Sequence, residues 1–150
     1  MHTDHLFLPL FIQNGNCIDT VYPPPGALYT KRDLMVDKLL GLQNQLRVFH
    51  WQTASYSEHK ALGKAYEALD GLIDTFIESW MGATGSKIKA GFTITMTDYR
   101  NRAATELLDQ AYTFLTGELE IQLSGRSELL NLRDEMLAVV QRTRYLLTLG

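Results

Sequence analysis

Residues 55–81 read SYSEHKALGKAYEALDGLIDTFIESWM, and this stretch decides the fold. Ser55 and Glu58 have the spacing of a capping box, in which two side chains satisfy backbone N–H groups of the first helical turn. Apolar side chains then recur at alternating intervals of four and three residues: Leu62, Tyr66, Leu69, Ile73, Phe76 and Trp80. This period predicts an amphipathic helix, which we expect Gly82 and Gly85 to end.

The segments on either side of this helix predict a second helix and a long connection. Thr30 to Asp33 resembles a capping box with Asp in place of Glu, and it opens a helix of about five turns. The apolar stripe of that helix consists of Met35, Leu39, Leu42, Leu46 and Phe49. Residues 82–96 are rich in Gly and Thr and have no helical period. At ~3.3 Å per residue they can extend ~50 Å, the length of a bundle.

The last third of the chain predicts two further helices. The third begins at about Thr97 and turns four side chains inward: Ala104, Leu108, Ala111 and Leu115. A break at residues 124–127 separates it from the fourth helix, whose stripe is Leu129, Leu132, Met136, Val139, Thr143 and Leu146. The expected fold class is therefore all-α, a ferritin-like four-helix bundle with one long crossover between helices 2 and 3. An up-down-up-down bundle would not need so long a connection.

Composition limits the domain count and the partners. The chain has 150 residues, of which 45% are hydrophobic and 21% charged, as in one globular domain. Residues 1–29 contain NGN and PPPG and predict an irregular N-terminal arm, and residues 30–150 form the bundle. A net charge of -3, with no Lys or Arg in the first 30 residues, argues against nucleic-acid binding. One cysteine and no long apolar run predict a protein without a membrane span, located in the cytoplasm.

Polar residues on the second helix do not fit a plain bundle. With His59 placed at 0° on a wheel of ~100° per residue, Glu67, Asp70, Asp74 and Glu78 fall between ~20° and ~100°. We expect this side of the helix to be acidic throughout, without lysine. Such a stripe indicates bound cations or a partner, although exposed acids on a mildly acidic protein are the plainer explanation.

His50 favours the metal interpretation. It lies in the last turn of the first helix, so it and His59 can face each other across the turn. Imidazoles together with carboxylates suit Fe, Zn, Cu or Mn. Asp74 lies ~22 Å beyond His59 along a straight helix, so one chain cannot bring both to one ion. Two subunits could do so if their second helices packed antiparallel about a two-fold axis, with Glu78 beside Asp74. Nearby apolar side chains could supply the dimer contact: Tyr56, Ile77 and Trp80.

Three segments of the chain resemble the Dps mini-ferritins. They are LRVFHW at residues 46–51, EH at residues 58–59 and LIDTFIE at residues 72–78. Dps proteins are ferritin-like four-helix proteins that assemble as hollow dodecamers and oxidise ferrous iron, commonly with hydrogen peroxide. The resemblance is strong over residues 34–82 and weaker over residues 97–148.

The Dps resemblance implies a site and an activity. His50 and His59 of one chain would bind iron with Asp74 and Glu78 of another across a two-fold interface, with Zn or Mn as substitutes. It implies a ferroxidase-type activity that oxidises Fe(II), stores ferric iron and protects from oxidative damage. The expected partner is a second copy of the chain, up to a dodecameric cage. Gly63 departs from the family pattern, because a carboxylate often stands there.

A second interpretation stays open. Short ferritin-like proteins of phages and some bacteria are more similar still, at residues 129–136 and 145–149. For those proteins an activity does not follow from the Dps resemblance, and the alternative is a non-catalytic structural or interaction protein, such as a component of a phage virion. Gly63 supports this interpretation, and the arm at residues 1–29 could dock the bundle onto a larger assembly.

Overall fold

The computed structural model describes residues 33–149, which form five helices and contain no strand. The expected arm at residues 1–29 and the expected helix start at Thr30 lie outside the described residues. The helices are α1 (Asp33–Gln52), α2 (Tyr56–Thr84), α3 (Ala103–Thr116), α4 (Glu118–Gln122) and α5 (Ser127–Leu146). The expected all-α class is therefore confirmed. No described helix has the length and apolarity that crossing a membrane requires.

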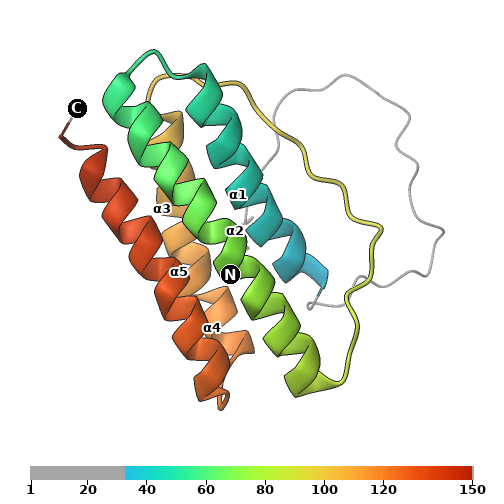
Figure 1. The fold of residues 1–150 in the computed structure, drawn as a ribbon. Helices are drawn as coiled ribbons and strands as arrows, with labels where there is room; N and C mark the ends of the chain where they lie inside the picture. The colour runs from blue at the N-terminus through green and yellow to red at the C-terminus, as the bar shows by residue number, and fades with distance from the viewer. Residues whose placement is uncertain (1–32, 150) are drawn as a thin grey trace, which may run out of the picture.

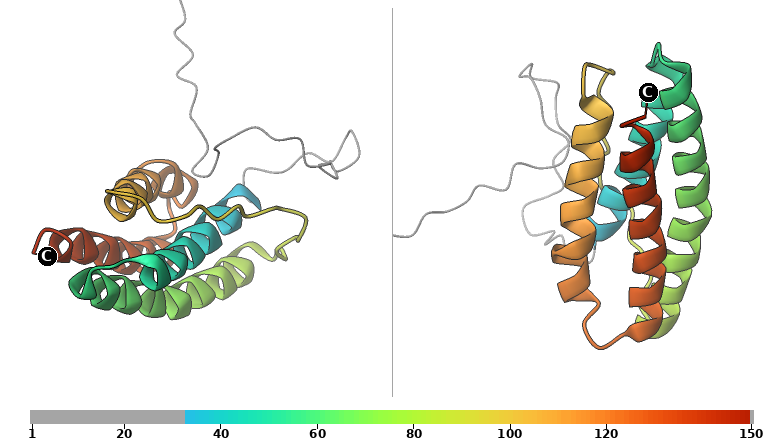
Figure 2. Two further views of the ribbon diagram at one scale, coloured as in Figure 1. Left: turned by 90° about the horizontal axis from the view of Figure 1, so that it is seen from above. Right: turned by 90° about the vertical axis from the view of Figure 1, so that its left-hand side faces the viewer.

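The helices form a bundle of four rods, in which α4 continues the direction of α3 (Figure 1). Helix α2 packs against α1 and α5, and α5 packs against α3. Helices α2 and α3 run in the same direction, so the chain returns along the whole bundle between them, as the yellow segment of Figure 1 shows. Seen from the side in Figure 2, α2 lies along one edge of the bundle and α3 along the opposite edge.

The apolar stripes that the sequence predicts form the core. All of the predicted inward residues of α1 and α3 are buried, and so are those of α2 except Tyr66, which is half-buried. Helix α5 is rotated slightly from the expectation. Leu132, Val139 and Leu146 are only half-buried, whereas Val140 and the unexpected Arg133 are buried.

The ends of α2 follow the capping signals in part. Ser55 is the N-cap, and its Oγ accepts a hydrogen bond from the N–H of Glu58 at 3.3 Å. Gly82 was expected to end the helix, but it lies inside α2. Gly85 ends it in a left-handed conformation with φ of 66°, which a residue without a Cβ adopts at little cost.

The third helix begins six residues later than the sequence predicts, at Ala103 instead of Thr97. The reason is a side chain of α1. Gln45 is buried, its Nε2 donates to the carbonyl of Thr97 at 2.8 Å, and its Oε1 accepts from the N–H of Thr97 at 2.8 Å. A helix that began at Thr97 would need this carbonyl to accept an intrahelical hydrogen bond, so Gln45 competes with helix formation here.

Gln52, two turns further along α1, holds the same connection. Its Oε1 accepts from the N–H of Tyr99 at 2.6 Å, and its Nε2 donates to Asp98 at 2.9 Å. The ring of Tyr99 packs edge-on against Phe49, with ring centroids 5.6 Å apart. The end of the connection is therefore fastened to the half of α1 that carries His50.

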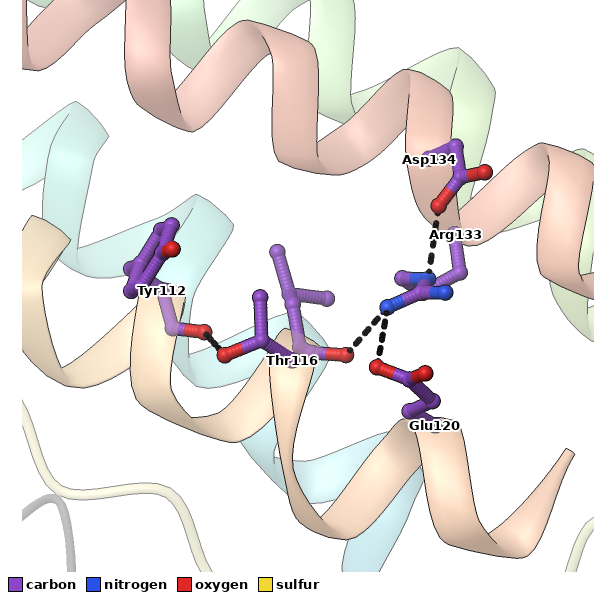
Figure 3. A network of polar contacts seen from close by, with 6 residues as sticks. Tyr112, Thr116, Glu120, Arg133 and Asp134 are labelled. Atoms are coloured by element: carbon purple, nitrogen blue, oxygen red, sulfur yellow. Dashed lines mark hydrogen bonds and ion pairs between the residues drawn. The ribbon is translucent and has the colours of Figure 1, made fainter.

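A buried arginine joins α5 to the break between α3 and α4. Gly117 interrupts the helix, and a Cβ at this position would stand 2.9 Å from the carbonyl oxygen of Thr113. Arg133 donates from one terminal nitrogen to the carbonyl of Leu115 and to Glu120, each at 3.1 Å (Figure 3). Its Nε lies 2.9 Å from a carboxylate oxygen of Asp134. Arg133 and Asp134 thus form an ion pair, whereas the sequence pattern of α5 did not predict the burial of Arg133.

Candidate metal site

His50 and His59 form a reciprocal pair across the turn between α1 and α2. The Nδ1 of His50 lies 2.7 Å from the carbonyl oxygen of His59, and the Nδ1 of His59 lies 2.8 Å from the carbonyl oxygen of His50. The two rings are stacked, with centroids 3.8 Å apart and planes inclined by 21°. His50 stands in the last turn of α1, where carbonyl groups lack a helical partner, so His59 caps that helix.

These hydrogen bonds fix which nitrogen of each ring carries the proton. A carbonyl oxygen can only accept, so both Nδ1 atoms must donate. In the neutral imidazole the Nε2 atom then keeps its lone pair, which is the form that binds a metal ion. A backbone acceptor at the second nitrogen is also the usual support of a histidine that ligates metal. In their neutral form both half-buried rings are therefore held in the tautomer that can bind a metal ion through Nε2.

Gly63 makes room for this pair. A Cβ at residue 63 would stand 3.0 Å from Cε1 and 3.1 Å from Nδ1 of His50, closer than carbon atoms normally approach. The carboxylate that the Dps resemblance places here could not fit beside the ring in its observed position. The absence of a carboxylate at Gly63 is thus a consequence of how His50 packs.

Further aromatic and charged side chains surround the histidine pair along the hairpin. The ring of Tyr56 lies parallel to His59 at 6.5 Å, and Tyr66 meets His50 edge-on at 5.3 Å. The guanidinium of Arg47 lies over Tyr66, 4.9 Å from the ring centre. Arg47 is also 3.9 Å from Asp70, which accepts a hydrogen bond from Gln43 at 3.0 Å.

Glu58, which is next to His59 in the sequence, is used by the fold and not by the site. Its carboxylate accepts hydrogen bonds from the hydroxyl groups of Tyr99 and Thr53. Burial raises the pKa of Tyr99 above its ordinary value of 10.0, and the hydrogen bond to Glu58 and the charge of that carboxylate raise the pKa further. These contacts tie the long connection to the start of α2.

Asp74 and Glu78 are exposed on α2 and make no hydrogen bond or ion pair with any described residue. Asp74 is ~22 Å from His59 along the helix axis. Within the described residues, no three side chains of His, Cys, Asp or Glu come together as a metal site. A single chain therefore brings the two histidines together but leaves Asp74 and Glu78 far from them. The predicted site for this reason needs a second subunit.

Residues 50–147 match a family of unknown function (DUF5856). The chain belongs to this family. The DUF5856 match begins at His50 and includes all four predicted ligands, and it ends one residue after α5. No curated protein and no solved structure matches the chain.

Two expectations for this DUF5856 chain are wrong in detail. Trp80 is buried in the core of its own chain and is not available for a dimer contact, whereas Tyr56 is exposed and Ile77 half-buried. The polar side of α2 is not acidic throughout, because Lys60 falls at ~100° and Lys64 at ~140° on the same wheel. Both lysines are exposed.

Proposed function

We propose that this chain is a ferritin-like subunit of the Dps kind that binds Fe(II) between two copies and oxidises it to Fe(III). Iron is the substrate of this reaction. The supporting observation is the reciprocal pair of hydrogen bonds between His50 and His59, which orients both rings and leaves both Nε2 atoms as acceptors when the rings are neutral. The parallel course of α2 and α3, with a connection that runs along the bundle (Figure 1), also supports the proposal, because one long crossover is typical of ferritin-like bundles.

The donor set fits ferrous iron. Two neutral imidazoles and two carboxylates are nitrogen and oxygen ligands, which suit Fe(II) and also Zn or Mn. Asp74 and Glu78 are neighbours at i and i+4, so both can reach one ion or bridge two. The lone pair of an imidazole lies in the plane of its ring, and the planes of His50 and His59 are stacked. In this arrangement each ring addresses its own ion, and sharing one ion requires one ring to turn.

The side chains have simple roles in this reaction. The histidines and carboxylates would hold the iron. Each Fe(II) gives up one electron, and the acceptor is hydrogen peroxide or dioxygen; one peroxide takes two electrons and two protons to give two waters. No protein nucleophile is needed. In the full proposal the subunits form a cage, up to a dodecamer, in the cytoplasm or in a virion.

The test follows the oxidation of Fe(II) by ferric absorbance in the metal-stripped protein, with and without peroxide. We expect oxidation well above the protein-free rate, saturating at one or two irons per chain. The decisive variant is His59→Asn, because the Asn amide nitrogen takes the position of Nδ1 and keeps the bond to the carbonyl of His50, while the ligand at Nε2 is lost. Its rate should fall at least tenfold at unchanged thermal stability. His50→Asn tests the other ring in the same way.

The control is Glu135→Ala, which removes an exposed carboxylate of α5 that lies on another helix. Its oxidation rate should equal that of the wild type. A wild-type protein that oxidises Fe(II) no faster than buffer would refute the proposal.

A structural role is the second candidate, and one observation favours it. The hydrogen bonds and the stack of His50 and His59 already close the α1–α2 turn, so the pair has a use without any metal. In that case wild-type protein binds no Fe(II), and His59→Asn has no phenotype. The bundle would then serve as a component of a larger assembly, such as a virion.

A further inference from the structure

Helix α2 presents a regular exposed stripe that no described part of the chain covers. Its positions recur at intervals of four and three residues, and all six are exposed: Lys60, Lys64, Glu67, Gly71, Asp74 and Glu78. Apart from the contact of Lys60 with the ring of Tyr56, these charges have no partner among the described residues. The helix packs on α1 and α5 with its other faces and lies along an edge of the bundle (Figure 2).

The order of the charges along the stripe makes helix α2 less stable in a single subunit. The basic residues occupy the first half of the stripe and the acidic residues the second half. As a result, the i and i+4 neighbours carry like charges, as in Lys60 with Lys64 and Asp74 with Glu78. Like charges at this spacing destabilise a helix, whereas alternating signs would stabilise it. A partner that brings opposite charges to both halves of the stripe would relieve this repulsion.

An antiparallel copy of the same helix matches this order. When two α2 helices pair about a two-fold axis level with Leu69, the position of Lys60 faces that of Glu78 in the second copy. The position of Lys64 then faces that of Asp74, and Glu67 faces Gly71. Each contact occurs twice by symmetry, so four ion pairs form, and no like charges are opposed at these positions.

Gly71 is the second observation that points to a close neighbour. Glycine in the middle of a helix is destabilising compared with alanine. Nothing in the described chain requires it, because a Cβ at residue 71 would have no atom within 4 Å. In the antiparallel pair it lies close to the axis, where the helices approach most closely and where it leaves room for Glu67.

We propose that a second copy of this chain docks on α2 in this register, through ion pairs of Lys60 with Glu78 and of Lys64 with Asp74. Exposed ion pairs contribute little affinity each, and they set the register and direction of the pairing. The exposed Tyr56 and the half-buried Ile77 flank the stripe and add apolar area. The inference rests on the two-fold pairing that the proposed function requires, but it does not require iron.

The register has a consequence for the metal site. It places His59 within one residue of the level of Glu78 in the second copy, about 1.5 Å along the axis. The ammonium groups of Lys60 and Lys64 then neutralise the same carboxylates that would bind iron. Metal binding and ion pairing compete for Asp74 and Glu78, so the dimer forms without metal and releases lysines when metal binds.

Charge reversal tests the pairing. The variant K60E/K64E makes the stripe acidic throughout, and D74K/E78K makes all four pairing positions basic and leaves only Glu67 acidic. Each variant alone should be monomeric by light scattering, because two like stripes repel. An equimolar mixture should form a one-to-one heterodimer by native mass spectrometry, with at least tenfold tighter association than either variant with itself. Rising salt should dissociate the wild-type dimer.

The matched control is E128K/E135K, which makes the same change of charge as D74K/E78K but on exposed positions of α5. It should dimerise like the wild type, and circular dichroism checks that every variant is folded. A wild-type monomer, a dimer of either charge-reversed variant alone, or a mixture that stays monomeric would overturn the proposal. Dimerisation of metal-free protein without iron oxidation would refute the proposed function alone.

Discussion

The backbone of Gly63 lies so close to the ring of His50 that a Cβ would stand 3.0 Å from Cε1 of the imidazole. The ring cannot retreat freely, because its Nδ1 is held by the carbonyl of His59 at 2.7 Å. The glycine at residue 63 thus makes the helix less stable than alanine would, but it leaves the space that the ring of His50 occupies. This contact also explains why the chain lacks a carboxylate where the Dps resemblance places one.

Gly63→Ala should therefore destabilise the protein, although alanine is the better helix former. We expect a loss of about 1–3 kcal/mol, because overpacking displaces the ring or breaks its hydrogen bond. Gly82→Ala is the matched control within α2, since its Cβ would meet nothing within 4 Å. That variant should gain about 0.5–1 kcal/mol. Urea denaturation at one fixed protein concentration compares the two variants. Equal stabilisation by both would show that the ring of His50 moves aside at no cost.

Gln45 holds the connection between α2 and α3 through both backbone groups of Thr97. Gln45→Ala leaves those groups without a partner and opens a cavity, so we expect a loss of about 2 kcal/mol. Amide exchange at Thr97 should accelerate in this variant before the helices open. Gln141→Ala, at an exposed position of α5, should change stability by less than about 0.5 kcal/mol. Unchanged exchange at Thr97 would contradict the assigned role of Gln45.

The sequence predicts the elements of this fold well where periodicity decides them. The stripes of α1, α2 and α3 are the ones observed, since a period of 3.6 residues directly selects the buried face. The sequence predicts the start of α3 poorly, because the side chain of Gln45, 52 residues away, binds the backbone of Thr97. Gly82 was expected to end α2, but glycine in open space inside a helix costs too little to stop it.

The candidate site was predictable only in part. The spacing of His50 and His59 around a turn indicates that they meet, and they do so. The sequence does not reveal that the rings are stacked or that each Nδ1 makes a hydrogen bond to a carbonyl group. These features depend on how closely α1 and α2 approach each other at Gly63. Lys60 and Lys64, which carry the proposed pairing of two α2 helices, were also overlooked, although their helical positions can be read from the sequence.

Arg133 is a buried cation whose loss should weaken the contact of α5 with the α3–α4 break. Arg133→Met keeps the aliphatic length but leaves the carbonyl of Leu115 and the carboxylate of Glu120 without their donor. We expect a loss of about 2–3 kcal/mol. Arg142→Met, at an exposed position of the same helix, serves as the control and should lie within about 0.5 kcal/mol of the wild type. If both variants melt alike, the network in Figure 3 contributes no stability.

Tyr99 should make the stability of the protein fall at alkaline pH. Its pKa in the folded state is raised above the ordinary 10.0, first by burial and then by the hydrogen bond to Glu58 and the charge of that carboxylate. The folded state therefore holds the phenolic proton more tightly than the unfolded state does. The resulting stability is fully present below pH 10 and is lost as the pH rises through the folded-state pKa. Tyr99→Phe cannot titrate, so its stability should be lower than that of the wild type at neutral pH and should fall less between pH 9 and pH 11. Urea denaturation across this range, with Tyr145→Phe as the exposed control, measures the difference, and parallel curves for Tyr99→Phe and the wild type would contradict the linkage.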